Sequence, residues 1–171
     1  LEDSEGVTRA DRQMISRTLL GLIRPRDFVV FAGSLPTDMR PDAYAQLTSL
    51  AQAAGAHVAL NAGGGDPLRL ALQARPNLIY LTQAQMEGLI NVPVRAEEDV
   101  IGAARMIRQR GVPRVLVAIE ETRTAYLLAD DGVWRAVWPD TSGTLAGVAS
   151  ALIAGFLAGR LEGESSEQAL R

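Results

Sequence analysis

The stretch AEEDVIGAARMIRQRGVPRVLVAI, residues 96–119, places an amphipathic helix directly before a short apolar strand. Four apolar side chains in its first part recur at the spacing of one helix face: Val100, Ala103, Ala104 and Ile107. Acidic residues at positions 97–99 and arginines at 108 and 110 match the two ends of the helix dipole. Gly111 predicts the end of this helix, and Val115–Ile119 predicts a strand that is buried on both faces.

Helices and strands also alternate along the rest of the chain. Buried strands are also predicted at residues 28–31, 57–60 and 78–81, and a hairpin is predicted from residues 124–128 and 133–138. Helices are predicted at residues 9–23, 42–54, 67–73 and 143–161, and Thr82 is expected to cap a further one. This alternation is typical of a parallel sheet with helices on both faces, to which the hairpin adds antiparallel strands. We therefore expect residues 1–171 to form a single α/β domain.

The composition is that of a globular protein, and it excludes several classes of function. Of the 171 residues, 47% are hydrophobic and 22% are charged, and the net charge is -3. The slight acidity gives no reason to expect nucleic acid or an anionic membrane as a partner. No cysteine occurs, so disulfides and thiolate metal sites are excluded and a cytoplasmic location is expected. The acidic first residues do not resemble a signal peptide, and no apolar run reaches the length of a membrane span.

In open α/β sheets, ligands bind at the loops that follow the carboxyl ends of the strands. The candidate loops are residues 33–37, 61–66, 82–85 and 120–124, together with the start of the last main helix. The glycine-rich segment Asn61–Asp66 admits two interpretations, a phosphate cradle or a plain turn before a helix. It matches neither the dinucleotide fingerprint nor the P-loop, so we prefer the plain turn.

Other residues whose side chains could bind a ligand or transfer a proton are interpreted as structural. His57, the single histidine, opens a strand at the end of the sheet opposite the candidate loops. Glu120 and Glu121 are carboxylates of the kind that bind metals or transfer protons, but adjacent residues on an extended chain point to opposite faces. Trp134 and Trp138 share a face of the hairpin by their even spacing, and we expect them to pack there rather than to stack on bases.

Short segments occur in an informative order along the chain. They are FAGSLP at residues 31–36, DVIGAA at 99–104 before RGV at 110–112, DGVW at 131–134, and AGFLAG at 154–159 before ESSEQALR at 164–171. In order and spacing they resemble the ribokinase-like (pfkB) carbohydrate kinase family, in its 1-phosphofructokinase and tagatose-6-phosphate kinase branch. The resemblance extends from about Arg26 onward. It implies a three-layer α/β/α fold that here lacks the family's N-terminal strands and lid.

Residues 147–150 fall where this family has Gly-Ala-Gly-Asp at the start of its last main helix. The resemblance implies that the amides of Gly147, Val148 and Ala149 lie at the anion hole for the transferring phosphoryl group. It also places Ser150 at the position of the aspartate that takes the proton from the sugar hydroxyl. A serine is no base at neutral pH, so Ser150 is expected to be non-functional as a catalyst.

Two further segments depart from the family's pattern on the nucleotide side. The family's Asn-x-x-Glu, which organises water around Mg²⁺, falls on Thr82–Gln85, where both polar anchors differ. The family's Ser-Leu-Gly-x-x-Gly, which approaches the phosphates of ATP, falls on residues 119–124 and supplies the nucleotide-side residues Glu121, Thr122 and Thr124. ATP and Mg²⁺ are thus implied by the family, while the residues present favour neither, and no metal ligand is assigned.

Gly33 and Ser34 fall on the family's sugar-side loop, so the resemblance implies a sugar phosphate there. Because three phosphate-side segments depart together, the sequence predicts a 1-phosphofructokinase-like domain that is catalytically inactive and has a scaffold, partner-binding or regulatory role. One alternative is a functional ATP-dependent sugar-phosphate kinase whose missing parts lie in a longer chain, and another is an unrelated Rossmann-like ligand-binding domain. A sheet without its first strands exposes an edge, so the expected partner is another protein chain or the rest of a longer one.

Overall fold

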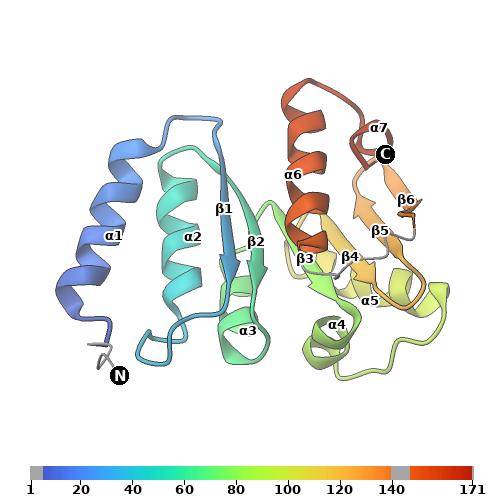
Figure 1. The fold of residues 1–171 in the computed structure, drawn as a ribbon, viewed down its shortest axis with the longest axis horizontal. Coiled ribbons are helices and arrows are strands. Elements are labelled where there is room, and N and C mark those ends of the chain that lie inside the picture. The colour runs from blue at the N-terminus through green and yellow to red at the C-terminus, as the bar shows by residue number, and fades with distance from the viewer. Residues whose placement is uncertain (1–5, 140–146, 171) are drawn as a thin grey trace.

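The structure, a computed structural model, describes residues 6–139 and 147–170. Within these residues, six strands form one sheet in the order in which they follow along the chain. They are β1 (Phe28–Gly33), β2 (His57–Ala62), β3 (Leu78–Thr82), β4 (Val115–Ile119), β5 (Thr124–Ala129) and β6 (Gly132–Val137). The first four are parallel, while β5 and β6 add antiparallel strands at one edge (Figure 1).

Helices cover the sheet on both sides. They are α1 (Arg9–Leu22), α2 (Ala43–Ala53), α3 (Asp66–Gln73), α4 (Gln83–Ile90), α5 (Glu97–Gln109), α6 (Val148–Leu161) and α7 (Ser166–Leu170). Helices α2 to α5 pack on one face, α6 and α7 pack on the other, and α1 lies outside α2 (Figure 1). In the parts of the chain that the structure describes, no helix has the length and apolar character to cross a membrane.

Alternate residues of the central strands supply the two apolar layers. One layer packs against α2 to α5 and includes Leu60, Ile79, Leu81, Val115 and Val117. The other packs against α6 and α7 and includes Ala59, Leu78, Tyr80, Leu116 and Ala118. Burying one such large side chain stabilises the fold by about 1.5–3 kcal/mol, so the continuous apolar runs of β3 and β4 hold both helical layers to the sheet.

The observed elements agree in kind with the sequence-based expectations apart from small shifts at their ends. The exception in burial is β1, which was expected to be a buried strand but has no fully buried residue, because the second face of the sheet is incompletely covered there. The first two strands each extend two residues past their apolar runs, because Gly33 and Ala62 still pair in the parallel ladder. Thr82 caps α4, as expected, and Thr8 caps α1. The last main helix begins at Val148 in the described residues, and the part of it that was expected at residues 143–146 lies outside them.

The second face of the sheet is incompletely covered at β1. Phe28 reaches the apolar cluster under α6, but Val30 is 45% exposed and Ala32 is also exposed. Among the described strands, β1 pairs with β2 alone, so its outer edge is open. An open edge at this place is what the sequence predicts for a ribokinase-like sheet without its first strands.

Candidate functional site

The loops after β1 and β2 are joined at the carboxyl ends of these strands. Gly33 ends β1 at φ +95°, and its carbonyl oxygen accepts a hydrogen bond of 3.0 Å from the N–H of Gly63. The hydroxyl of Tyr44 lies 3.2 and 3.0 Å from the carbonyl oxygens of Ala32 and Gly33, to which it donates. A Cβ atom at Gly63 would lie 2.9 Å from Oγ of Ser34. The predicted sugar-side residues therefore sit in a loop that is held by α2 and by the next loop.

The glycine-rich segment after β2 forms the entry to α3. Gly65 is the N-cap residue at φ +77°, and Pro67 lies in the first turn of the helix, as the sequence predicts. The carboxylate of Asp66 forms an exposed ion pair of 2.5 Å with Arg69. The segment thus serves as a turn into a helix, and phosphate binding by it stays a hypothesis.

Thr82 and Gln85 hold each other at the start of α4. Oγ1 of Thr82 accepts a hydrogen bond of 3.3 Å from the N–H of Gln85, and Oε1 of Gln85 accepts one of 3.0 Å from the N–H of Thr82. This capping box satisfies two amides that the helix leaves free. Nε2 of Gln85 also donates to the carbonyl oxygen of Ala62 at 3.0 Å. Both side chains are therefore engaged in holding the fold, and neither carries a charge.

Residues 120–123 form the turn between β4 and β5. The hydroxyl of Thr124 is buried and donates to the carbonyl oxygen of Thr122 at 3.1 Å. Glu120 and Glu121 are exposed in the turn, as is Thr122. The structure thus brings the predicted nucleotide-side residues to one end of the hairpin, with two carboxylates toward solvent.

The charge of this turn affects the pKa of Tyr80, which lies on β3 beneath α6. Its side chain is 2% exposed. Burial, and then the negative charge of Glu120, raise the pKa of Tyr80 to about 12. A negative field at this end of the sheet opposes the approach of a phosphate group.

The start of α6 combines open amides with an exposed serine. Gly147 is the N-cap residue at φ +94°, in the left-handed region that favours glycine. The amides of the first helical turn, which include those of Val148 and Ala149, have no acceptor within the helix. Ser150 is exposed in the same turn. The first amides of α6 therefore need an acceptor from outside the helix, while the position predicted for the base carries an alcohol.

An apolar hollow lies beside the first turn of α6. It has a volume of about 270 Å³ between the end of β6, α6 and α7, and its walls include Trp138, Val148, Leu152 and Phe156. Trp134 and Trp138 both pack against the core under α6, as the sequence predicts. The hollow itself was missed, because it forms only where the hairpin meets two later helices.

The residues near the candidate loops do not fit a Mg²⁺ site. Mg²⁺ prefers carboxylate and water oxygens in nearly octahedral geometry. Among residues 6–139 and 147–170, no group of three or more histidine or acidic side chains is arranged to hold a metal ion. Thr82 and Gln85 are neutral and already hydrogen-bonded, and the exposed carboxylates of Glu120 and Glu121 would repel the phosphates of ATP.

His57 lies at the opposite end of the sheet from these loops, as expected. It is exposed, and its ring is tilted against that of Phe28 with centroids 5.4 Å apart. With Arg26, Arg114 and Arg160 it lines a cavity that was not foreseen. Each arginine precedes a strand or ends α6, which is a signal in the sequence, but their convergence depends on how the sheet and α6 pack.

Sequence comparison identifies relatives among the 1-phosphofructokinases. The chain is 32% identical over 150 residues to 1-phosphofructokinase of Rhodobacter capsulatus, which covers 86% of this chain and 47% of that protein. It is 26% identical over 167 residues to 1-phosphofructokinase of Escherichia coli strain K12, which covers 96% and 53%. The chain therefore spans about half the length of the curated relatives it matches.

Solved structures share the fold. Phosphofructokinase-2 of Escherichia coli in complex with fructose-6-phosphate superposes with a TM-score of 0.86 at 22% identity, covering 96% of this chain and 54% of that one. Ribokinase of Arabidopsis thaliana complexed with ribose and ATP superposes with a TM-score of 0.68 at 18% identity, covering 97% and 50%. These likenesses show that the architecture is ribokinase-like.

The family assignment follows from the sequence profile together with the 32% identity to the Rhodobacter capsulatus protein. The profile of the pfkB family carbohydrate kinases matches residues 7–171, which is nearly the whole chain. This match excludes the alternative of an unrelated Rossmann-like domain. The chain belongs to the pfkB family of carbohydrate kinases, in its 1-phosphofructokinase branch.

Proposed function

We propose that this sugar-kinase domain performs no phosphotransfer and acts as a scaffold or partner-binding unit. The observation that carries the proposal is the exposed Ser150 in the first turn of α6, at the position that the family reserves for its base. A hydroxyl does not accept a proton at neutral pH, and general-base assistance contributes about 10²–10⁴-fold in rate. Ser150 therefore cannot replace the missing carboxylate.

The nucleotide side supports the same proposal independently. Gln85 is tied to Thr82 and Ala62 by hydrogen bonds, so it is not free to organise water around Mg²⁺. Glu120 and Glu121 stand exposed at the turn that would meet the phosphates of ATP. Three separate segments would need repair before this domain transferred a phosphoryl group.

A functional ATP-dependent sugar-phosphate kinase is the second candidate, and two features favour it. Gly147 has the left-handed conformation that suits a glycine at the start of α6. The apolar hollow beside Trp138 has walls suited to a nucleobase. Because the chain spans about half of its relatives' length, the remaining parts of such a kinase would lie elsewhere. Such a kinase would still lack a catalytic base at the position of Ser150.

Thermal unfolding with ATP and Mg²⁺ separates the two candidates. A nucleotide at a hundred times its dissociation constant adds about 2.7 kcal/mol to the free energy of unfolding, which is a clear rise in Tm. We expect no rise for this chain, with ATP alone as the blank. The corresponding half of the Rhodobacter capsulatus relative is the matched control, since it lacks the same remaining parts. A saturable rise for this chain would contradict the proposal.

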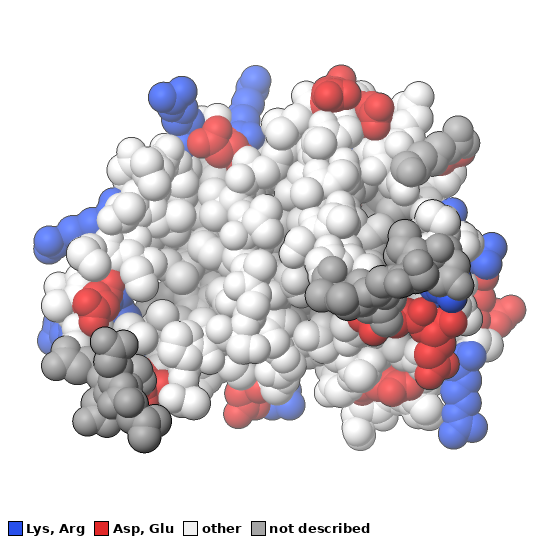
Figure 2. All heavy atoms as spheres, in the orientation of Figure 1, with Lys and Arg blue, Asp and Glu red and all other residues white. Residues whose placement is uncertain are grey.

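The open edge of β1 is the proposed contact for a protein partner. Val30 is 45% exposed there, and the face between α2 and α6 carries few charged side chains over its middle (Figure 2). An unpaired strand edge next to apolar surface accepts a further strand. The partner that fits is the remainder of a longer chain, since the relatives are about twice as long.

Sedimentation velocity tests this edge. We expect the isolated chain to associate, because a second copy can occupy an edge that lacks its own strand. The variant Val30→Asp should dissociate the complex, whereas Val133→Asp, at an equally exposed valine on β6, should not. A concentration-independent monomer would rule out the proposed edge contact. A sugar phosphate at the Gly33–Ser34 loop and a cytoplasmic location stay predictions.

A further inference from the structure

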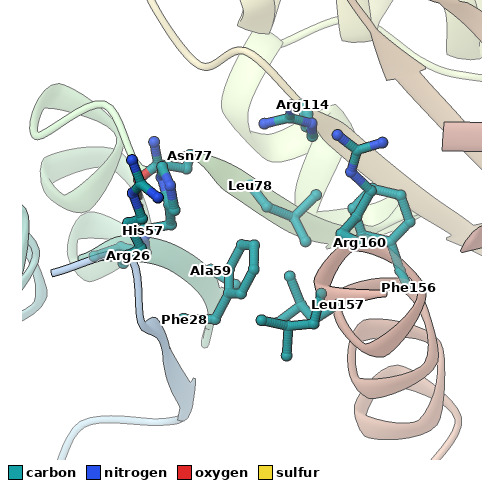
Figure 3. A pocket seen from close by; sticks show the side chains of 12 residues that line it. Arg26, Phe28, His57, Ala59, Asn77, Leu78, Arg114, Phe156, Leu157 and Arg160 are labelled. Atoms are coloured by element: carbon teal, nitrogen blue, oxygen red, sulfur yellow. Dashed lines mark hydrogen bonds between the residues drawn. The ribbon is translucent and has the colours of Figure 1, made fainter. Parts of the chain in front are cut away.

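A cavity lies at the amino ends of the parallel strands, away from the candidate loops. Its volume is about 340 Å³, and it is bounded by the starts of β1 to β4 and by the C-terminal part of α6 (Figure 3). The pocket size is within the range of small-molecule sites. No residue assigned above to the sugar, the nucleotide or the base lines this cavity.

Three arginines from three separate segments border the cavity. Arg26 precedes β1, Arg114 precedes β4, and Arg160 lies in the last turn of α6. Figure 3 shows the guanidinium groups of Arg114 and Arg160 on one side of the hollow and Arg26 beside His57 on the other. Among the described residues, no carboxylate forms an ion pair with any of these arginines. The site therefore concentrates positive charge without a counter-ion from the described chain.

Arg114 has an unsatisfied donor next to the cavity. Its Nε is buried, and it has no hydrogen-bond partner among the described atoms. A buried N–H group without an acceptor is unfavourable, so native proteins rarely leave one. The Nε atom is covered by protein atoms, so an anion in the cavity would meet the terminal N–H groups of Arg114 rather than this one.

Backbone carbonyl groups anchor the main chain at Arg26 and the side chain of Arg160. The N–H of Arg26 donates to the carbonyl oxygen of Gly55 at 2.8 Å, which anchors the turn before β1. Nη1 of Arg160 donates to the carbonyl oxygen of Glu164, which ties the end of α6 to the following loop. The guanidinium group of Arg160 is thereby held in place before a ligand arrives, so it needs little ordering on binding.

The floor of the cavity is apolar. Four apolar side chains lie between Arg26 on one side and Arg114 and Arg160 on the other (Figure 3). They are Phe28, Ala59, Leu78 and Leu157. Guanidinium groups bind phosphate and carboxylate with paired hydrogen bonds, and apolar walls select a ligand with an apolar portion. We propose that this cavity is a binding site for a small organic anion, with its phosphate or carboxylate at the arginines and an apolar group on the floor.

Phenyl phosphate is the probe that combines both features, and calorimetry on the 171-residue chain measures its affinity. We expect saturable binding that weakens about tenfold or more in Arg114→Gln and in Arg160→Gln, since each loses a charge-assisted hydrogen bond. The matched control is Arg105→Gln, an exposed arginine of α5, which should bind as the parent does. Equal affinity in all four proteins would overturn the proposal, because it would show that neither Arg114 nor Arg160 contributes to binding.

Two further measurements keep the test decisive if a variant folds poorly. His57 is the single histidine of the chain, so its imidazole NMR signals report on the cavity in the unmodified protein. Addition of phenyl phosphate should shift them saturably, and unshifted signals would overturn the proposal.

Phe28→Ala should weaken the binding of phenyl phosphate but not that of inorganic phosphate. If the arginines instead receive a carboxylate from a second polypeptide, phosphate would lower the sedimentation coefficient, and that result would also overturn the small-ligand proposal.

Discussion

Nε2 of Gln85, at the start of α4, donates a hydrogen bond of 3.0 Å to the carbonyl oxygen of Ala62, at the end of β2. The same side chain closes the capping box with Thr82 through Oε1. One neutral amide thus joins two loops at the carboxyl end of the sheet. A carboxylate at this position, which the family uses near Mg²⁺, could cap the helix but could not donate to Ala62.

Replacing Gln85 should therefore lower the free energy of unfolding. Gln85→Ala loses the cap and the link, and we expect the free energy of unfolding to fall by about 1–2 kcal/mol. Gln85→Glu should lose a similar amount at neutral pH, because the carboxylate faces a carbonyl oxygen. Urea denaturation measures both. Gln109→Ala, at an exposed glutamine near the end of α5, is the control and should change little.

Gly63 tests the close approach of the first two loops. A Cβ there would lie 2.9 Å from Oγ and 3.4 Å from Cα of Ser34, so Gly63→Ala should destabilise the fold by about 1–3 kcal/mol. Gly64→Ala is the matched control, because nothing lies within 4 Å of its Cβ position. Equal midpoints of thermal unfolding for the two variants would show that the loops do not touch.

Substitution of Gly147 tests the left-handed backbone conformation before α6. No described atom lies within 4 Å of a Cβ at Gly147, but its φ of +94° is unfavourable for alanine, so Gly147→Ala should cost about 1–2 kcal/mol. Gly155→Ala, inside the same helix, should instead stabilise by about 0.5–1 kcal/mol, since its Cβ position is also open. Chemical denaturation that gave both variants the same sign would contradict the left-handed cap.

Thr48 and Thr124 form a second matched pair. Both are buried, but the hydroxyl of Thr48 has no partner among the described atoms, while that of Thr124 donates to Thr122. Thr48→Val removes an unsatisfied hydroxyl and should stabilise the fold by about 1 kcal/mol, whereas Thr124→Val should destabilise it by about the same amount. Differential scanning calorimetry provides the comparison, and a stabilised Thr124→Val would disprove the assigned hydrogen bond.

Alkaline pH should weaken the fold through Tyr80. Its pKa is about 12 in the folded chain because of burial and Glu120, against an ordinary value of about 10 when unfolded. Between these values the folded state holds the proton that the unfolded state has released. Stability is therefore complete below pH 10 and falls as the pH rises to 12, by up to about 1.4 kcal/mol per pH unit.

The variant Tyr80→Phe isolates this contribution. It should flatten part of the fall in stability above pH 10, measured by urea denaturation at several pH values. Burial also raises the pKa of Tyr44 and Tyr126, so the remainder of the fall belongs to them. A Tyr80→Phe protein with the same alkaline slope as the parent would show that Tyr80 ionises normally in the folded state.

The candidate site was predictable to the extent that it depends on local sequence. Thr82 is a good N-cap residue at the end of an apolar run, so its role in α4 follows from neighbours in the chain. The partner of Gln85 at Ala62 lies 23 residues away and belongs to another strand, so no local pattern could reveal it. The family resemblance supplied the position of Ser150, and the structure supplied its exposure.

The sequence by itself determined the order of helices and strands, because apolar periodicity and turn residues act over a few neighbours. It also determined that Ser150 is not a base and that Gln85 carries no charge, since these are properties of the side chains themselves. Only the tertiary structure decided that Val30 stays exposed on β1 and that Arg26, Arg114 and Arg160 border one cavity. These features depend on the packing of α6 across the sheet, which brings together residues up to 134 positions apart in the chain, from Arg26 to Arg160.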